Sequence, residues 1–126
     1  MDRKELAVNY KHNGHNCCQS VLCAFSEELN MPIEELDKMG ACFGGGMGTM
    51  ESTCGSLCGA QMILGIKTFE GKPVIRNAAS LHKAFNEKCG ATICKDLKGR
   101  DTGVVLCECD NCVRNAVTVL EEALNL

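Results

Sequence analysis

The sequence predicts a mostly α-helical protein, a single-domain helical bundle of about five helices with a glycine-rich loop, spanning residues 1–126. Three observations favour this class. Apolar residues recur every three or four positions along several segments, which is the spacing of an amphipathic helix. Proline and glycine stand where such segments would begin and end. A chain of 126 residues can also bury the core of one domain without disulfide support.

The first half of the chain contains two predicted helices and the loop. The first helix covers residues 16–29, where apolar side chains recur at every fourth position. A short second helix follows Pro32, because proline suits a first helical turn, and Gly40 is placed to end it. Residues 41–48 contain four glycines and are predicted to form the glycine-rich loop.

The second half contains three more predicted helices. Thr49 can cap the third helix, whose apolar stripe extends to Ile66. A fourth helix is predicted over residues 73–89, between a proline and a glycine. Residues 94–109 are predicted to be a loop with a short extended piece at its β-branched residues. The regular spacing of apolar residues over 110–124 predicts the last helix.

Cysteine is the most informative residue type in this chain. The N-terminal residues mix both charges and lack the apolar run of a signal peptide, so we expect a cytoplasmic protein. Thiols in a reducing compartment stay free unless they bind metal or take part in redox chemistry, and an odd number cannot pair completely within one chain. The eleven cysteines are Cys17, Cys18, Cys23, Cys42, Cys54, Cys58, Cys89, Cys94, Cys107, Cys109 and Cys112.

Charge and hydropathy argue against two classes of partner. Thirteen basic and sixteen acidic residues give a net charge of −3, which disfavours binding to nucleic acid or to an anionic membrane surface. No apolar segment approaches the roughly 20 residues that a membrane-spanning helix needs. We therefore expect neither nucleic acid nor a membrane as partner. The apolar faces of the predicted helices could also form the interface of a homodimer.

Three cysteine pairs are close in sequence: Cys54 with Cys58, Cys89 with Cys94, and Cys109 with Cys112. A cysteine at a helix start is stabilised as thiolate by the positive end of the helix, which favours metal binding and redox chemistry. The last pair is a C-x-x-C, shared by zinc sites, iron–sulfur sites and dithiol oxidoreductases. It lacks the second C-x-x-C of a zinc ribbon and the following histidine of a haem site.

Several segments taken together resemble one family. They are NCCQSVL at 16–22, GGGMG at 44–48, ESTCGSLCGA at 51–60, GATIC at 90–94, and Cys112. In this order they are similar to the landmarks of the C-GCAxxG-C-C family, which is described as redox-active. Two positions depart from its pattern: Ser56 stands in place of alanine, and Cys18 stands where a small residue is common. Neither departure removes a thiol.

The resemblance implies a site. It marks Cys17, Cys54, Cys94 and Cys112 as the functional cysteines and leaves the other seven as extras. A related arrangement in the non-haem part of split-Soret cytochrome c accompanies an iron–sulfur centre. The resemblance thus implies a small electron-transfer protein that binds an iron–sulfur cluster, as [2Fe–2S], through these four cysteines and acts with a redox partner protein.

Two alternatives stay open at this point. The first is a dithiol/disulfide oxidoreductase that uses Cys109 and Cys112 or two of the family cysteines, with no metal. The second is a structural protein that binds zinc through its thiols. Anaerobic metal analysis separates the three hypotheses.

The remaining polar candidates have simpler interpretations. Lys95, Lys98 and Arg100 fit a solvated loop, although they could offset the negative charge of a thiolate site. His12 and His15 precede Cys17 closely enough to be alternative ligands or proton donors. Free cysteine is among the most buried residue types. On that ground we assign Cys23, Cys42 and Cys58 to the core.

Overall fold

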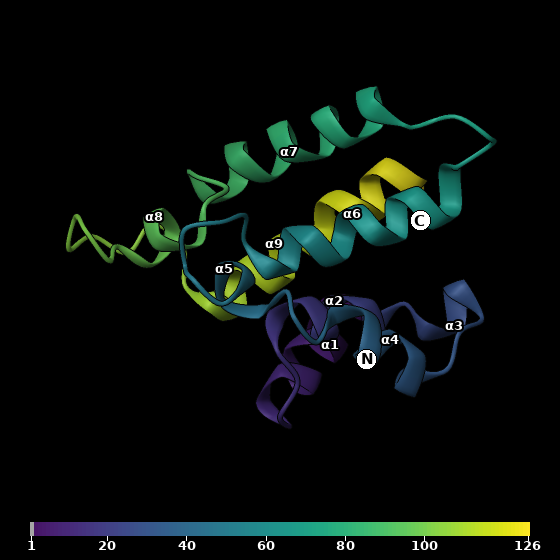
Figure 1. The fold of residues 1–126 in the computed structure, drawn as a ribbon, viewed down its shortest axis with the longest axis horizontal. Coiled ribbons are helices and arrows are strands. Elements are labelled where there is room, and N and C mark those ends of the chain that lie inside the picture. Colours follow the sequence, from purple (N-terminus) through teal and green to yellow (C-terminus); the bar gives the residue numbers. More distant parts are fainter. Residues whose placement is uncertain (1) are drawn as a thin grey trace.

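The computed structural model describes residues 2–126, and these residues form helices joined by short loops (Figure 1). The helical segments are α1 (Arg3–His12), α2 (Cys17–Ala24), α3 (Ser26–Leu29), α4 (Ile33–Gly40), α5 (Gly44–Met47), α6 (Gly55–Thr68), α7 (Ile75–Cys89), α8 (Cys94–Lys98) and α9 (Cys109–Leu124). The described chain contains no β-strand, only an isolated bridge between Thr53 and Ile93. The mostly α-helical class is confirmed, whereas the number of about five helices was too low.

Helix α1 is one reason for the low number, since no helix was predicted there. Asp2 caps it by accepting a hydrogen bond from the backbone N–H of Glu5 at 2.9 Å. The helix buries Ala7 and Val8 and packs against α2 and α9. Its apolar face is short, so the helix depends on this tertiary packing more than on its own pattern.

The predicted helix over 16–29 is divided into α2 and α3 at Phe25, whose φ of −105° and ψ of 14° are not helical. Helix α4 agrees with its prediction.

The third predicted helix is α6, which begins later than predicted, at Gly55, because Thr49 forms a local turn instead of a cap. Its hydroxyl donates to the carbonyl of Gly46 and accepts from the N–H of Glu51, and Met50 has a left-handed φ of 63°.

Helices α7 and α9 also agree with their predictions. The predicted loop over 94–109 contains the additional short helix α8, which ends at Gly99 with a φ of 70°. The residue at this position must be small, because a Cβ would lie 2.4 Å from the carbonyl oxygen of Val104. The predicted extended piece, 104–106, forms no strand and is exposed.

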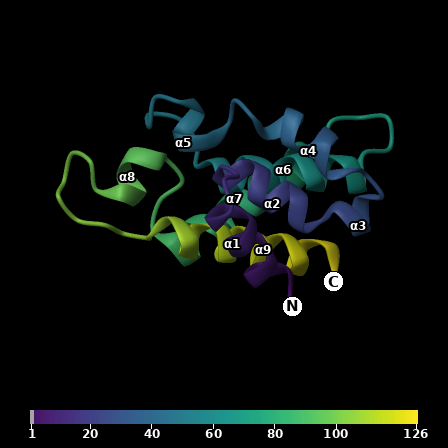
Figure 2. The same cartoon turned by 90° about the horizontal axis from the view of Figure 1, so that it is seen from below.

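The core lies where α2 packs along α6 and where α9 packs against α1, α6 and α7. Figures 1 and 2 show α6, α7 and α9 running lengthwise, with α5 and α8 together at one end of the molecule. The largest fully buried side chains include Phe25, Phe85 and Leu22. Within the described residues, no helix combines the length and apolar character needed to cross a bilayer.

Candidate functional site

Three of the four cysteines marked by the family resemblance lie at helix starts. Cys17 and Cys94 are the first residues of α2 and α8, and Cys54 is the N-cap of α6. Cys112 is the fourth residue of α9, and its backbone N–H already pairs with the carbonyl of Glu108. Unpaired backbone N–H groups and the positive end of the helix dipole favour a negative charge at the first three positions. The helix ends therefore favour thiolate at these three positions, although burial opposes this effect at Cys17 and Cys94.

Backbone pairing brings the starts of α6 and α8 together. The N–H of Cys54 donates to the carbonyl of Thr92 at 2.8 Å, and the N–H of Cys94 donates to the carbonyl of Ser52 at 3.0 Å. These bonds flank the isolated bridge between Thr53 and Ile93. Two cysteines that are 40 positions apart in sequence are consequently held on adjacent segments.

Two glycines allow the other chain segments to approach this pair. A Cβ on Gly55 would lie 2.5 Å from the sulfur of Cys17 and 2.4 Å from the carbonyl oxygen of Phe43. A Cβ on Gly46, whose φ is 61°, would lie 2.6 Å from the Cβ of Cys94. The absence of side chains at these two positions makes room for Cys17 over the start of α6 and for Cys94 under the glycine-rich loop.

Cys54 is buried and contacts polar groups. Its sulfur lies 3.0 Å from the hydroxyl oxygen of Ser56. Hydrogen bonding from the Cys112 thiol, and then from the side chain and backbone N–H of Ser56, lowers the pKa of Cys54 to about 6 in spite of burial. The Ser56 that replaces the family's alanine thus contributes a hydrogen-bond donor to the site.

Cys112 connects this pair to a second group of thiols. The sulfurs of Cys89, Cys107 and Cys112 lie within 4.8 Å of one another, and all three residues are buried. Hydrogen bonding to Cys54 and Cys89 raises the pKa of Cys112, while the bond from Cys112 is the largest cause that lowers the pKa of Cys89 to about 6. Asn115 donates its amide to Cys89 at 3.3 Å and to Cys107 at 3.8 Å.

Lys98 supplies positive charge among these sulfurs. Its ammonium nitrogen is 4.0 Å from the sulfur of Cys112, and it also hydrogen-bonds Cys109. Burial lowers the pKa of Lys98, but the bond to Cys109 and the charges of Cys112, Cys109 and Cys54 outweigh this effect and raise it. Lys95 and Arg100, in contrast, form exposed ion pairs with Asp101.

Burial, followed by the charges of neighbouring sulfurs, raises the pKa of Cys17, although the N–H of Gly45 favours its thiolate. Burial is also the largest cause that raises the pKa of Cys94. Closely spaced thiols cannot all ionise unless a cation is present. A thiophilic metal releases those protons when it binds. The thiols, the N–H groups of Gly45 and Ser56 and the space left by the two glycines therefore fit a thiophilic metal centre.

The structure brings the four predicted cysteines together unequally. Cys54 and Cys112 shift each other's pKa, and Cys17 and Cys94 approach the start of α6 from two sides. In the described chain, the sulfurs that lie mutually within 4.8 Å are nevertheless those of Cys89, Cys107 and Cys112. No local sequence pattern indicated this second group.

The remaining sequence predictions have mixed outcomes. Cys23 and Cys58 are buried as predicted, but Cys42 is exposed, because it lies in the turn after α4 and not in the helix. The histidine rings contact carboxylates. His12 lies 2.8 Å from Asp110, and His15 lies 2.8 Å from Asp37, within a polar group that also includes Cys23.

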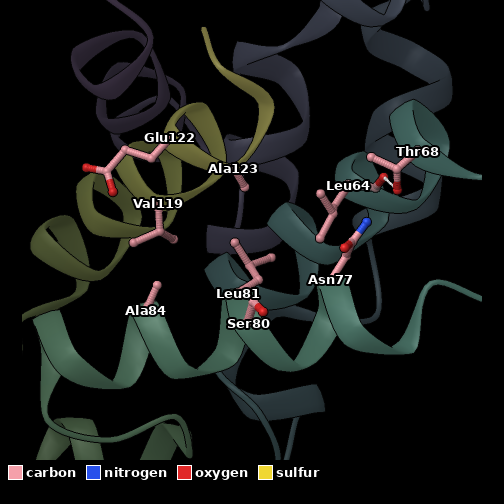
Figure 3. Close-up of a pocket in the computed structure, with 9 residues that line it drawn as sticks. All are labelled: Leu64, Thr68, Asn77, Ser80, Leu81, Ala84, Val119, Glu122 and Ala123. Carbon is pink, nitrogen blue, oxygen red and sulfur yellow. Dashed lines mark hydrogen bonds between the residues drawn. The ribbon is translucent and has the colours of Figure 1, made fainter.

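A pocket of about 400 Å³ lies elsewhere, between α6, α7 and α9 (Figure 3). Its lining includes Leu64, Leu81 and Val119, and Glu122 is its one ionisable side chain. It contains neither cysteine nor histidine. The candidate site is therefore the group of cysteines around Cys54, Cys94 and Cys112.

Comparison with known proteins gives one match. The family model described as "Putative redox-active protein (C_GCAxxG_C_C)" matches residues 15–123. No curated protein and no solved structure matches the chain. The matched range includes every cysteine of the site.

Proposed function

The chain belongs to the C_GCAxxG_C_C family of redox-active proteins, and from this premise we propose that it is an electron-transfer protein that binds an iron–sulfur cluster. The proposed ligands are Cys17, Cys54, Cys94 and Cys112. The observation that carries the proposal is that the segments of Cys17, Cys54 and Cys94 pack against one another, with the charge of Lys98 acting on these three cysteines and on Cys112.

The charges in the site support this choice. The pKa of each of the four cysteines is influenced by the charge of Lys98, which favours the thiolate form in every case. A centre with four thiolates is anionic and needs such compensation when it is buried. The backbone N–H groups of Gly45 and Ser56 favour thiolate at Cys17 and Cys54. When bound, the cluster supplies one-electron redox chemistry that thiols alone do not provide.

The surroundings of the site also suit electron transfer. Cys54, Cys94 and Cys112 are buried, so the chain excludes water from most of the proposed ligands. Gly45 and Met47 of α5 are exposed, and Gly46 between them packs against Cys94. We propose that a redox partner protein approaches at this end of the molecule.

Anaerobic purification, followed by reconstitution with iron and sulfide, tests the proposal. We expect bound iron, acid-labile sulfide and visible absorption from sulfur-to-iron charge transfer. A colourless protein that binds no iron contradicts the proposal, and one zinc per chain without a chromophore indicates the structural zinc alternative. The sulfur contacts of Cys112 are with Cys54, Cys89 and Cys107, so they give no support to a working Cys109–Cys112 pair.

A further inference from the structure

Cys89 and Cys107 form a pair of their own beside the proposed ligand Cys112. Cys89 is the last residue of α7, and Cys107 lies two residues before α9. Their sulfurs are within 4.8 Å, and one amide group, that of Asn115, donates to both. Asn115 therefore holds the two sulfurs side by side. Neither cysteine belongs to the four that the family resemblance marks.

The two sulfurs differ in how they can be reached. A surface cavity of about 440 Å³ has Cys107 in its lining, whereas Cys89 does not line it. Cys107 is 8% exposed and Cys89 is 3% exposed. Val105 and Leu106 form an apolar part of the cavity wall. A reagent in this cavity meets Cys107 first, with Cys89 behind it.

We propose that Cys107 and Cys89 form a dithiol–disulfide couple that reduces low-molecular-weight disulfides, with Cys107 as the attacking sulfur and Cys89 as the resolving sulfur. The inference does not depend on whether the four family cysteines hold a cluster. It adds a two-electron centre next to the proposed one-electron centre.

The reaction has two exchange steps. The sulfur of Cys107 attacks one sulfur of the disulfide R–S–S–R, whose S–S bond breaks. A mixed disulfide forms on Cys107, and one R–SH leaves with the proton that Cys107 loses. The sulfur of Cys89 then attacks the sulfur of Cys107 as a thiolate, and the second R–S⁻ leaves and takes up from solvent the proton that Cys89 had released. Two protein thiols are oxidised by two electrons, and R–S–S–R is reduced to two thiols.

The resulting disulfide would close a loop over residues 90–106, which contains α8 and therefore Cys94 and Lys98. Cys112 is less suited to either role, since only 1% of its surface is exposed and it does not line the cavity. We therefore expect the pairing to be specific to Cys89 and Cys107.

Peptide mapping tests the pairing. Reduced wild-type protein is incubated anaerobically with oxidised glutathione, quenched with acid and alkylated. We expect a peptide linked through Cys89 and Cys107, lighter by two hydrogen atoms than the two reduced peptides together. Exposed Cys42 is the internal control and should carry glutathione. The proposal is overturned if Cys42 reacts while Cys89 and Cys107 stay free, or if Cys107 is linked to Cys109 or Cys112 instead.

Single variants test the order of attack. Cys89→Ser should accumulate glutathione on Cys107, and Cys107→Ser should leave Cys89 unmodified. The reverse pattern overturns the assignment of roles. The wild-type mapping needs no variant, so it decides the pairing even where a substitution impairs folding.

Iron analysis separates this inference from the proposed function. Cys89→Ser and Cys107→Ser should keep the iron and visible absorption of the wild type. Loss of iron from both variants identifies these cysteines as ligands and overturns the dithiol assignment. If the wild type binds no iron, the proposed function fails, but the link between Cys89 and Cys107 is still expected.

Discussion

Cys54 and Cys58 lie one helical turn apart at the start of α6, and both are buried, with 2% and 6% of their surfaces exposed. Their acidities nevertheless move in opposite directions. Contacts with Cys112 and Ser56 lower the pKa of Cys54 to about 6. Burial, followed by the charges of Cys54 and Cys17, raises the pKa of Cys58 to about 11.

The comparison shows that burial alone does not make a thiol inert or reactive. Cys54 is the N-cap of α6 and meets donors from Ser56 and Cys112, with the charge of Lys98 nearby. Cys58 lies inside the helix, where its backbone N–H already pairs with the carbonyl of Cys54. A helix start supplies unpaired donors and positive potential, whereas the next turn supplies neither. The same residue type is therefore a candidate ligand at one position and a core residue at the other.

The largest effect on stability is expected from Gly55, whose lack of a side chain allows Cys17 to pack against the start of α6. Gly55→Ala would place a Cβ 2.4 Å from a backbone oxygen, so we expect a loss of about 2–3 kcal/mol in the free energy of unfolding. Gly65→Ala in the same helix is the matched control. It meets no atom within 4 Å and should gain about 0.5–1 kcal/mol. Equal effects in urea denaturation would contradict the packing described here.

A pH series distinguishes the two cysteines in metal-free, reduced protein. The folded pKa of Cys54 lies below its unfolded value of about 8.5, so its thiolate stabilises the fold above that pH and loses this effect as pH falls towards about 6. The stability difference between wild type and Cys54→Ser should shrink over that range.

Cys58 should show the opposite dependence. Its folded pKa is raised, so its contribution is complete below about 8.5 and is lost as pH rises towards about 11. The stability difference between wild type and Cys58→Ser should therefore shrink only on the alkaline side. The same pH dependence for both variants would remove the electrostatic distinction between the two positions.

Removing the charge of Lys98 should reduce the difference in pKa between Cys54 and Cys58. The charge of Lys98 contributes less to the low pKa of Cys54 than Cys112 and Ser56 do, so Lys98→Gln should lower the thiolate fraction of Cys54 below pH 6 only modestly. Ultraviolet thiolate absorbance in metal-free protein measures this change. Lys95→Gln is the control, since Lys95 pairs with Asp101 at 3.6 Å, and it should leave the absorbance unchanged.

The smallest effect concerns Cys58 as a packing residue. Cys58→Ala should cost about 1 kcal/mol of unfolding free energy, since it leaves a small gap in the core. Cys42→Ala removes an exposed side chain and should stay within about 0.5 kcal/mol of the wild type. A larger loss for Cys42→Ala would show that the turn after α4 is packed more tightly than its exposure indicates.

Local patterns predicted those parts of the fold that depend on local spacing. Helices α7 and α9 have long apolar stripes and clear end signals, and both lie where the sequence predicts them. The start of α6 was misplaced, because Met50 adopts a left-handed conformation that no residue pattern indicates. Helix α8 was missed because long-range bonds support it, including the bond from the N–H of Lys95 to the carbonyl of Met50 at 2.7 Å.

The site was predictable only where a family pattern exists. The four marked cysteines came from that resemblance and not from spacing. Cys89 and Cys107, which lie beside Cys112, were not predicted as neighbours. The whole segment that contains α8 separates them in the sequence. Lys98 belongs to a run of charges that fits a solvated loop, and only the fold turns it towards Cys109 and Cys112.

Iron retention in Cys54→Ser compared with Cys58→Ser tests the central claim most directly. Both variants replace one buried sulfur in the same helix, so general effects on folding are matched. We expect the first to lose most of its iron after anaerobic reconstitution and the second to keep the wild-type content. Equal retention, or loss from Cys58→Ser alone, would contradict the assignment of the helix-start cysteines as the ligands.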